Sequence, residues 1–550
     1  MPTQSPFRSP LTFGLWLAFA LALFIFVSAA ASTGPGITWD EPGYIQAGFC
    51  YGYWVRHPNS NITELWEPNH EHPPAAKILY GFGAYLARGD IYPSLMTARF
   101  LATILFSVFL GMVYLFVARP FGRAAGIIAT LSFVLMPRVF GHSHLAELDM
   151  PVAFACLVTT LLFAWAGPSP KRSIAPGLAW GLALLTKLNA AFLPLVLIPW
   201  AFWRYGRRAI LPSVVFLVLG AVIFIGGWPW LWPDIPGRVK NYVVNKTERL
   251  GEGDRPTGTT DIPVYYLGHT YREERAPWHY PFVLTLVTVP AGILVFAGFG
   301  IREALRRKNP PDAAPAAGLT GQTIQTGRTS PANPAGPATP GAWSPAGRHA
   351  IGVLILASTL LPLIVCALPG VPKYDGVRLF MPAFPFLACL AGIGGARIWR
   401  WRGPLGRGLV TAVLIATALV LHATHPYELS YYNLLAGGAP GARKLGFETT
   451  YWGDTVNVRV VDYINQHALK GGTIGFRPNY LADFPWPDGR IPWLREDLRF
   501  VPFGQTDYLV VFPRQGYLDD TTRALIETKT PLRTWSYLDV PQCYLFQNVR

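Results

Sequence analysis

Charged residues are scarce in this chain of 550 residues: they make up 14% of it, whereas hydrophobic residues make up 51%. Soluble domains of ordinary composition carry about 25% charged residues, so the chain is not an ordinary soluble enzyme. Intrinsic disorder of the whole chain is excluded as well, because so many apolar residues can bury a large core.

Cysteine is also rare. Of the five cysteines, Cys156, Cys366 and Cys389 lie inside apolar runs. Only Cys50 and Cys543 remain for regions exposed to water, and two such residues do not make a disulfide framework. The sequence therefore excludes a disulfide-stapled scaffold.

Long apolar runs are what the chain has instead, and most are long enough to cross a membrane as helices. They lie near residues 11–31, 97–118, 123–137, 149–167, 174–190, 191–203, 209–228, 281–301, 349–369, 379–396 and 408–423. The high aromatic content, 14% with 19 Trp, suits a protein that is anchored at two membrane–water interfaces. We therefore expect an all-α polytopic membrane protein with about eleven transmembrane helices.

The net charge of +15 would suggest a nucleic-acid partner if it were spread over the chain. With the N-terminus placed in the cytoplasm, however, the basic surplus falls on the inner segments, for example at Arg204, Arg207 and Arg208. This follows the positive-inside rule, so the charge reflects topology and no nucleic acid is expected. The run at 11–31 is longer than a signal-peptide core of roughly 7–15 residues, which favours a retained anchor.

The chain divides into a predicted transmembrane catalytic domain, 1–423, and a tail. Within the first part, residues 32–93 and 229–280 are expected to form outer loops. Residues 309–347 consist largely of Pro, Ala, Gly, Thr and Ser. That composition cannot bury a core, so it predicts a disordered cytoplasmic loop.

The tail, 424–550, is polar and is predicted to be a small extracytoplasmic α/β domain. Its pattern favours strands at 472–476 and 508–512, and helices at 455–467 and 521–528.

The first outer loop opens with two adjacent carboxylates, Asp40 and Glu41, directly after the first apolar run. Burial and like-charge proximity can turn one member of such a pair into a useful base. A structural alternative is that Asp40 caps a surface helix with Pro42 in its first turn.

Further along this loop, the segment from Asn69 to Lys77 reads Asn-His-Glu-His-Pro-Pro-Ala-Ala-Lys. Three metal donors so close together do not converge without a tight turn, so a shaped sugar or phosphate pocket is favoured over a metal site. His72 is a candidate for that pocket. Lys77 can meet a phosphate, or it can extend to lipid head groups.

The next outer loop holds Arg138, His142, His144, Glu147 and Asp149. The two histidines with the following acids imitate a metal site, but no third group at a fixed distance supports it. Asp149 starts an apolar run, so it is either a helix N-cap or a functional acid.

Two further cations lie at outer ends of apolar runs. An ionisable residue such as Lys187 at that depth is functional by default unless it reaches the interface. Arg378, in Tyr374-Asp375-Gly376-Val377-Arg378, can clamp a phosphate with two parallel hydrogen bonds. It can also pair with Asp375, and the two roles are not exclusive.

In this order, the Asp-Glu pair, the His-Pro-Pro element, the Leu-Asp-Met-Pro segment (148–151) and the Gly-Leu-Ala-x-x-Thr-Lys motif (181–187) resemble the GT-C superfamily of membrane glycosyltransferases. The branch that they resemble contains the protein O-mannosyltransferases and the lipid A aminoarabinose transferases. The resemblance is best over residues 36–190 and looser through 263–268, 277–280 and 374–378. Ala75-Ala76 departs from the Leu that often follows Pro-Pro, which affects the packing of this turn.

The resemblance implies an inverting transfer of a sugar from a polyprenyl-phosphate donor to an acceptor hydroxyl on the outer membrane face. Asp40 is then the expected base and Glu41 orients its neighbours, while Arg378 is the first candidate for the donor phosphate, ahead of Lys77 and Arg138. The expected acceptor and sugar pocket consists of His72, His144, Asp149 and Tyr374. No metal or other cofactor is expected, because phosphate is already a good leaving group. The composition suggests a bacterial inner membrane, with the active site facing the periplasm.

Two other functions stay open at this stage. A flippase or transporter of lipid-linked sugars would share the apolar runs, but it would favour ionisable groups in mid-membrane. An oligosaccharide transferase or ligase would move a whole glycan. The sugar and the acceptor (protein, lipid or glycan) are not determined by the sequence.

Overall fold

The computed structural model describes residues 34–86, 91–248, 262–272, 276–306, 345–371, 373–478, 493–501 and 506–549, together with four positions between 14 and 21. The predicted first membrane run, 11–31, lies almost wholly outside these residues. Most of the predicted disordered loop, 309–347, lies outside them too.

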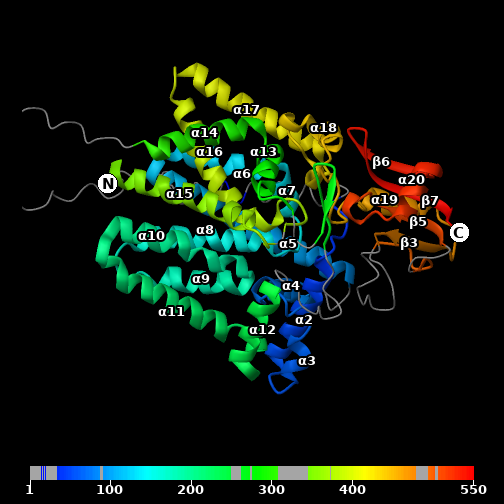
Figure 1. Ribbon diagram of the computed structural model, residues 1–550, viewed down its shortest axis with the longest axis horizontal. Helices are drawn as coiled ribbons and strands as arrows, with labels where there is room; N and C mark the ends of the chain where they lie inside the picture. Colours follow the sequence, from blue (N-terminus) through cyan, green and yellow to red (C-terminus); the bar gives the residue numbers. More distant parts are fainter. Residues whose placement is uncertain are drawn as a thin grey trace, which may run out of the picture.

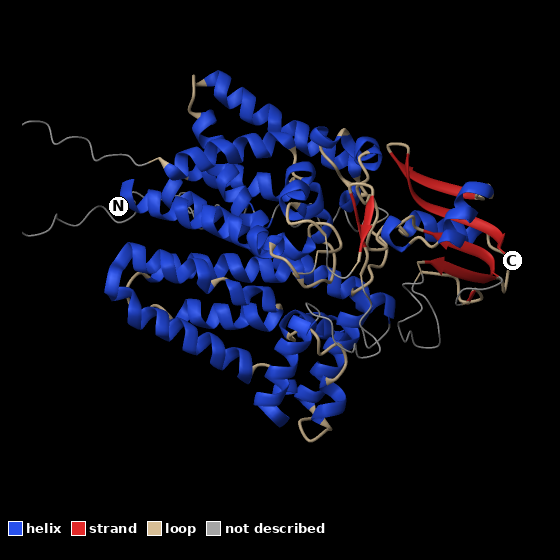
Figure 2. Cartoon of the chain, in the orientation of Figure 1, coloured by secondary structure: helices blue, strands red, loops and turns tan. Residues whose placement is uncertain are grey.

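Helices make up most of the described chain, and they form a bundle that carries a smaller sheet region at one end (Figures 1 and 2). The first helices are α2 (Glu41–Arg56), α3 (Ile62–Trp66), α4 (Ala75–Leu86), α5 (Ile91–Phe121), α6 (Arg123–Val134), α7 (Pro137–His142), α8 (Asp149–Ala166) and α9 (Ile174–Thr186). They are followed by α10 (Pro194–Tyr205), α11 (Ile210–Gly226), α12 (Ile235–Glu248), α13 (Tyr280–Thr288), α14 (Ala291–Leu305), α15 (Pro345–Ala367), α16 (Phe384–Trp399) and α17 (Pro404–Thr424).

Six helical segments of the described chain are long and apolar enough to cross a membrane, or seven if the bent pair α13–α14 is one span. All the predicted apolar runs from 97–118 onward coincide with helices of the bundle. Some of those helices, such as α6 and α9, are short. An apolar and mostly helical membrane bundle is thus confirmed, while the count of eleven spans stays a prediction.

The predicted apolar run at 281–301 is divided into two helices. The chain bends by 116° between α13 and α14, because Pro290 offers no N–H and Val289 before it is extended (φ −87°, ψ 133°). The side chain of Asn433 donates to the carbonyl oxygens of Leu286 (2.7 Å) and Val289 (2.6 Å). This amide satisfies carbonyls that the broken helix leaves without partners.

The centre of the bundle is α16, which packs against α6, α14 and α15. Glycines permit the close approach to α14: a Cβ at Gly394 would lie 1.9 Å from the carbonyl oxygen of Phe296, and one at Gly300 would lie 1.9 Å from that of Leu390. Backbones that touch so closely hold the two helices in a fixed relative position, and η5 (Arg378–Ala383) leads into α16 at the end where the candidate site is built.

The C-terminal region contains a five-stranded sheet with strand order β4-β3-β5-β7-β6. Its strands are β3 (Thr473–Arg477), β4 (Arg499–Phe500), β5 (Thr506–Val511), β6 (Arg533–Tyr537) and β7 (Val540–Val549). The central pair β3–β5 is parallel, with Ile474 opposite Tyr508, whereas β7 runs antiparallel to both of its neighbours. Helices α19 (Val458–His467) and α20 (Asp520–Thr528) complete this region, so the two strands and two helices expected here are confirmed.

Smaller elements connect the bundle and the sheet. They are the 3₁₀ helices η2 (Leu188–Phe192), η5 (Arg378–Ala383), η6 (Glu428–Ser430) and η7 (Leu434–Ala436), the helix α18 (Gly438–Lys444) and the hairpin β1 (Val264–Tyr266)–β2 (His269–Tyr271). Two of them, η2 and η5, begin directly beside the charged cluster described next.

Candidate active site

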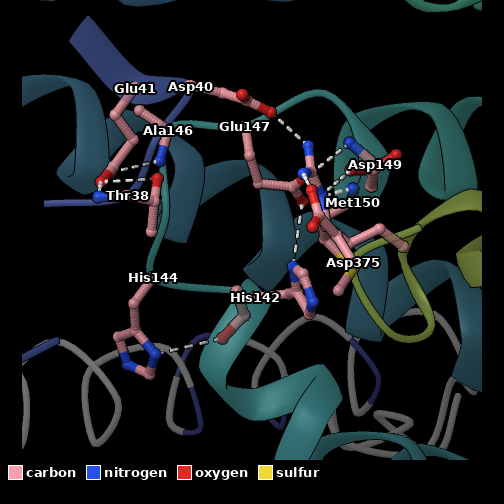
Figure 3. A network of polar contacts seen from close by, with 12 residues as sticks. Thr38, Asp40, Glu41, His142, His144, Ala146, Glu147, Asp149, Met150 and Asp375 are labelled. Carbon is pink, nitrogen blue, oxygen red and sulfur yellow. Dashed lines mark hydrogen bonds and ion pairs between the residues drawn. The ribbon is translucent and has the colours of Figure 1, made fainter. Parts of the chain in front are cut away.

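Three carboxylates converge on the guanidinium of Arg378, the first residue of η5. Its Nε lies 3.0 Å from Asp149 and its Nη1 lies 2.7 Å from Asp375, while its Nη2 is paired with Asp40. The guanidinium carbon also lies 3.7 Å from the centre of the Trp452 ring. Residues that are far apart in the sequence meet because α2, α8 and η5 all start at this point, and Figure 3 shows the three acids on one side of the site.

Two more cations complete the cluster. Lys187, which directly follows α9, is paired with Asp149, and Arg514 of the tail donates to Asp375 at 2.7 Å. The cluster therefore contains three carboxylates, each paired with at least one of three cations. The carboxylates are Asp40, Asp149 and Asp375, and the cations are Arg378, Lys187 and Arg514. Asp149 and Arg378 are buried, and buried charges are tolerated only when they are paired in this way.

Asp40 is the member of the cluster that solvent reaches. Its side chain is 25% exposed, compared with 1% for Asp149 and 7% for Asp375. Arg378 and the Tyr44 hydroxyl (3.2 Å) both contact its Oδ2, and no hydrogen bond to its Oδ1 is found among the described residues. The carboxylate is thus held through one oxygen and open through the other.

Neither aspartate uses its side chain to cap a helix. Asp40 is the N-cap residue of α2 with Pro42 in the first turn, as the structural alternative expected, but it makes no side-chain capping hydrogen bond. At the start of α8, the carboxylate of Glu147 accepts from the backbone N–H groups of Asp149 and Met150 (2.6 Å). Desolvation, with Asp149 nearby, holds the pKa of Glu147 well above its usual value. Glu147 therefore does the capping, and the Asp149 side chain is left to the cluster.

Glu41 belongs to a different network from its neighbour, as Figure 3 shows. Its carboxylate is fully buried and forms two hydrogen bonds with Arg99, at 2.7 and 2.6 Å. It also accepts from Thr38 and from the backbone N–H of Ala146 (2.9 Å). A direct catalytic contact of Glu41 is excluded in this conformation by its burial, whereas an orienting role agrees with these bonds, which tie the first loop to α5 and to the loop before α8.

The position of Arg378 was predicted correctly, but its surroundings do not suit a phosphate clamp. Each of its three nitrogen atoms already donates to a carboxylate, and three nearby negative charges oppose a further anion. The pairing with Asp375 that was left open is present. Arg378 therefore positions the acids, above all Asp40.

Lys77 lies near the ring of Tyr44, the tyrosine whose hydroxyl bonds to Asp40. It is fully buried in α4, which excludes extension to lipid head groups. Its ammonium donates to the carbonyl oxygens of Asn69 and His72 (2.6 Å), and it lies 6.0 Å from the centre of the Tyr44 ring. The His72 ring packs edge-on against the same tyrosine at 6.0 Å. The His-Pro-Pro segment thus brings Lys77 and His72 beside the residue that holds Asp40.

Arg138 is buried beneath the turn that precedes Arg378. Its guanidinium lies between the rings of Tyr432 (4.8 Å) and Tyr451 (5.6 Å), and its Nε donates to a backbone carbonyl. A Cβ at Gly376 (φ +65°) would lie 2.7 Å from its Nη1. Arg138 is only 1% exposed, and its contacts support this turn.

Two other predicted pocket residues differ in their placement. Tyr374 lies beside the cluster, and desolvation raises the pKa of its hydroxyl. His144 points away from the acids (Figure 3) and binds the Phe140 carbonyl at 2.8 Å, so it does not join the cluster.

No metal-site arrangement of three or more His, Cys, Asp or Glu side chains occurs in the part of the chain that the structure describes. His142, which suggested one, is fully buried, and its desolvation lowers its pKa to about 3. It is therefore neutral.

The tail supplies residues that the sequence did not reveal. Arg514 stacks over Tyr517 at 4.1 Å, and Tyr517 lies 5.5 Å from Trp39 in the first loop. The carboxylate of Glu448 accepts from the backbone N–H groups of Gln515 (2.8 Å) and Gly516 (3.0 Å). Desolvation raises the pKa of Glu448 to about 7. These contacts fix Arg514 against Asp375, and no motif in the sequence around it indicates this.

Comparison with known proteins supports the class that the site suggests. Residues 71–232 match the family model described as dolichyl-phosphate-mannose-protein mannosyltransferase. No curated protein matches the chain. The match covers α4 to the 3₁₀ turn after α11, including Lys77, Asp149 and Lys187. It supports the resemblance to GT-C membrane glycosyltransferases. The apolar helices indicate an integral membrane protein.

Solved structures of the same class are similar over much of the chain. ArnT from Cupriavidus metallidurans bound to undecaprenyl phosphate has 17% identity and a TM-score of 0.47, with 98% of each chain covered. The oligosaccharyltransferase AglB from Archaeoglobus fulgidus, in complex with an inhibitory peptide and a dolichol-phosphate, has 11% identity and a TM-score of 0.47, with 84% of this chain and 59% of that one covered. The S. cerevisiae Pmt1-Pmt2 complex has 14% identity and a TM-score of 0.32, with 47% and 39% covered. At TM-scores below 0.5, these similarities give no residue-by-residue correspondence.

Proposed function

We propose that the protein is an inverting glycosyltransferase that moves a sugar from a polyprenyl-phosphate donor to an acceptor hydroxyl on the outer face of the membrane. The observation that carries the proposal is the half-open carboxylate of Asp40, held through Oδ2 and reachable through Oδ1. The matched family description, which names a dolichyl-phosphate mannose donor, supports the same donor class.

Asp40 acts as the general base in this proposal. Its Oδ1 takes the proton of the acceptor hydroxyl as the acceptor oxygen bonds to the anomeric carbon of the sugar. The bond from that carbon to the phosphate oxygen breaks on the opposite face, and its electron pair leaves with the polyprenyl phosphate. Because the acceptor oxygen attacks on one face of the carbon and the phosphate leaves from the opposite face, the configuration inverts.

Arg378 fixes the direction of this attack. Because Nε and Nη1 are anchored on Asp149 and Asp375, Nη2 presents a fixed donor to Asp40. A planar guanidinium can hold three acceptors at set angles, which a single ammonium cannot. We infer that Arg378 is a positioning residue for the base.

Lys77 is then the better candidate for the donor phosphate. Its ammonium donates to the carbonyl oxygens of Asn69 and His72, which hold it in place beside Tyr44. Tyr44 contacts both groups, through its ring on the side of Lys77 and through its hydroxyl on Asp40, so the cation lies near the proposed base. Positive charge near a leaving phosphate stabilises the charge that develops in the transition state.

The remaining assignments are proposed as the sequence suggests them. The acceptor and the sugar are open, His72, Asp149 and Tyr374 border the pocket, and the reaction requires no cofactor. We place the protein in a bacterial inner membrane with the cluster facing the periplasm. The charged cluster lies at the ends of the spans and not in mid-membrane, which favours an enzyme over a transporter.

The proposal is tested with purified full-length protein in lipid nanodiscs and a radiolabelled polyprenyl-phosphate sugar. We expect release of free polyprenyl phosphate by the wild type, with a loss of at least about a hundredfold in Asp40→Asn. Asp462→Asn is the matched control, because Asp462 is exposed on α19. Movement of labelled donor across liposomes without release of polyprenyl phosphate would instead identify a flippase, and turnover only with long glycan donors would identify an oligosaccharide ligase.

A further inference from the structure

A second concave site lies at the end of the bundle opposite the charged cluster. It is an open hollow of about 490 Å³, lined by Arg119, Ala164, Trp165, Ala166, Gly167, Pro168, Ser169, Arg172 and Tyr205. Its volume falls within the range of small-molecule sites, about 300–1,000 Å³. Neither the family match nor the proposed transfer reaction accounts for it.

Helix α8 shows how far the two sites are apart. It begins at Asp149 in the charged cluster and ends at Ala166 in the hollow. At a rise of 1.5 Å per residue, its length is about 25 Å. In Figure 1, this end of α8 and the end of α10 lie on the side of the bundle away from the sheet. The hollow is therefore separate from the proposed active site.

Two arginines from different elements face this hollow. Arg119, near the end of α5, stacks over the ring of Trp165 at 4.0 Å, and Arg172 lies in the loop before α9. Both are exposed, and neither forms an ion pair with a carboxylate among the described residues. Stacking on an indole face leaves the N–H groups at the edge of a guanidinium available. The hollow thus offers two guanidinium groups, each with several N–H donors, that are not paired with a carboxylate among the described residues.

The loop between α8 and α9 gives the hollow its shape. Gly167 adopts φ +60°, which favours glycine, and Ser173 donates both its N–H and its hydroxyl to the Ser169 carbonyl at 3.0 Å. The loop therefore turns back on itself, and Ser169 lines the hollow together with Tyr205 of α10. Hydroxyl and guanidinium donors together match the oxygens of a phosphate group.

The surroundings identify the form in which a phosphate would arrive. The hollow lies where the candidate spans Ser94–Phe121 and Asp149–Ala166 end, which is the depth of lipid head groups. Beside Tyr205, the side chains of Phe202 and Trp203 are 41% and 53% exposed. Exposed aromatic residues at this depth are typical of a surface that faces lipid. A phosphate group that reaches this hollow would therefore come from the head-group layer of the membrane.

We propose that this hollow binds the phosphodiester head group of an anionic glycerophospholipid. Arg119 and Arg172 hold the phosphate oxygens, the hydroxyls of Ser169 and Tyr205 bond the remaining oxygens, and Trp165 packs against the glycerol. Binding joins α5, α8 and α10 at the end remote from the reaction, and so it stabilises the bundle without taking part in transfer.

The experiment uses full-length protein in detergent and dioctanoyl phosphatidylglycerol as the probe. Native mass spectrometry counts the retained lipid, and thermal unfolding follows the stabilisation. We expect Arg119→Gln and Arg172→Gln each to weaken binding about tenfold, as the loss of one charge-assisted contact predicts. Arg400→Gln is the matched control, because Arg400 is exposed at the same end of the bundle, directly after α16. It should change binding less than twofold.

Three outcomes would overturn the proposal. An equal loss in Arg400→Gln would show general attraction between basic residues and anionic lipid. Equal stabilisation by inorganic phosphate, lost in the same variants, would show that the site takes free phosphate and not a lipid. Equal retention of dioctanoyl phosphatidylcholine would show that anionic charge is not recognised. Arg172 is exposed in a loop, so its single variant carries the test if substitution of Arg119 unfolds the protein.

Discussion

Arg378→Lys is the substitution that best separates a positioning role from a phosphate clamp. Lysine keeps the positive charge but cannot reach three carboxylates that lie against three different guanidinium nitrogens. Asp149 keeps Lys187 and Asp375 keeps Arg514. Asp40 has no second cation among the described residues, so it is the acid that loses its partner.

The size of the effect follows from the one contact that is lost. A hydrogen bond to a charged group contributes about 1.5–3 kcal/mol, and each 1.36 kcal/mol is tenfold in rate. We therefore expect kcat to fall by about ten- to a hundredfold, with the donor KM unchanged.

The assay measures kcat and donor KM in nanodiscs for Arg378→Lys, Asp40→Asn and the double variant. Because Arg378 acts through Asp40, the double variant should be no slower than Asp40→Asn alone. A donor KM that rises in Arg378→Lys, together with losses that multiply in the double variant, would refute the positioning role and restore the phosphate clamp. An Arg378→Lys enzyme with wild-type kcat and KM would refute both roles.

Three further predictions concern stability, its dependence on pH, and the segment 312–342. Glu41→Gln should destabilise the protein by about 3–5 kcal/mol, because it leaves the Arg99 guanidinium buried without its counter-charge; thermal unfolding measures this, with the exposed Glu64→Gln as the control. Desolvation raises the pKa of Glu448 to about 7, so the folded protein keeps this proton up to about pH 7 while the unfolded chain loses it at about pH 4–5. Stability should therefore fall as pH rises through that window, and Glu448→Gln should abolish this part of the fall when unfolding is followed at about pH 5 and pH 8. Deletion of residues 312–342, whose composition cannot bury a core, should leave turnover nearly unchanged, and an inactive but well-expressed deletion would contradict this.

Periodic and local signals in the sequence predicted much of the fold. Apolar runs located the long helices of the bundle, and short apolar stretches in the polar tail located β3 and β5. The break at Val289–Pro290 was missed because the run 281–301 is apolar throughout, although its proline is a visible signal. What repairs this break is the Asn433 side chain, a contact across more than a hundred residues that no local pattern can indicate.

The candidate site was predictable residue by residue but not as a set of contacts. Asp40, Asp149, Lys187 and Arg378 each stand out as ionisable residues at the edge of an apolar run. Which of them pair is decided by where helices start in space, so the sequence could not show that Arg378 is shared by three acids. Arg514 could not be found at all, because it lies in a tail whose contact with Asp375 depends on tertiary structure alone.

The convergence of helix starts explains why so many charges can lie together without destabilising the protein. The N-terminal end of a helix carries a partial positive charge, and Asp40, Asp149 and Asp375 lie at or just before the starts of α2, α8 and η5. The partial charges stabilise negative charge at these three positions, and Arg378, Lys187 and Arg514 pair with the three carboxylates. Only one carboxylate oxygen with no hydrogen bond among the described residues then remains at the edge that solvent reaches, on Asp40. A base that is fixed in direction, and is still open to an acceptor, is what transfer from a lipid-linked donor requires.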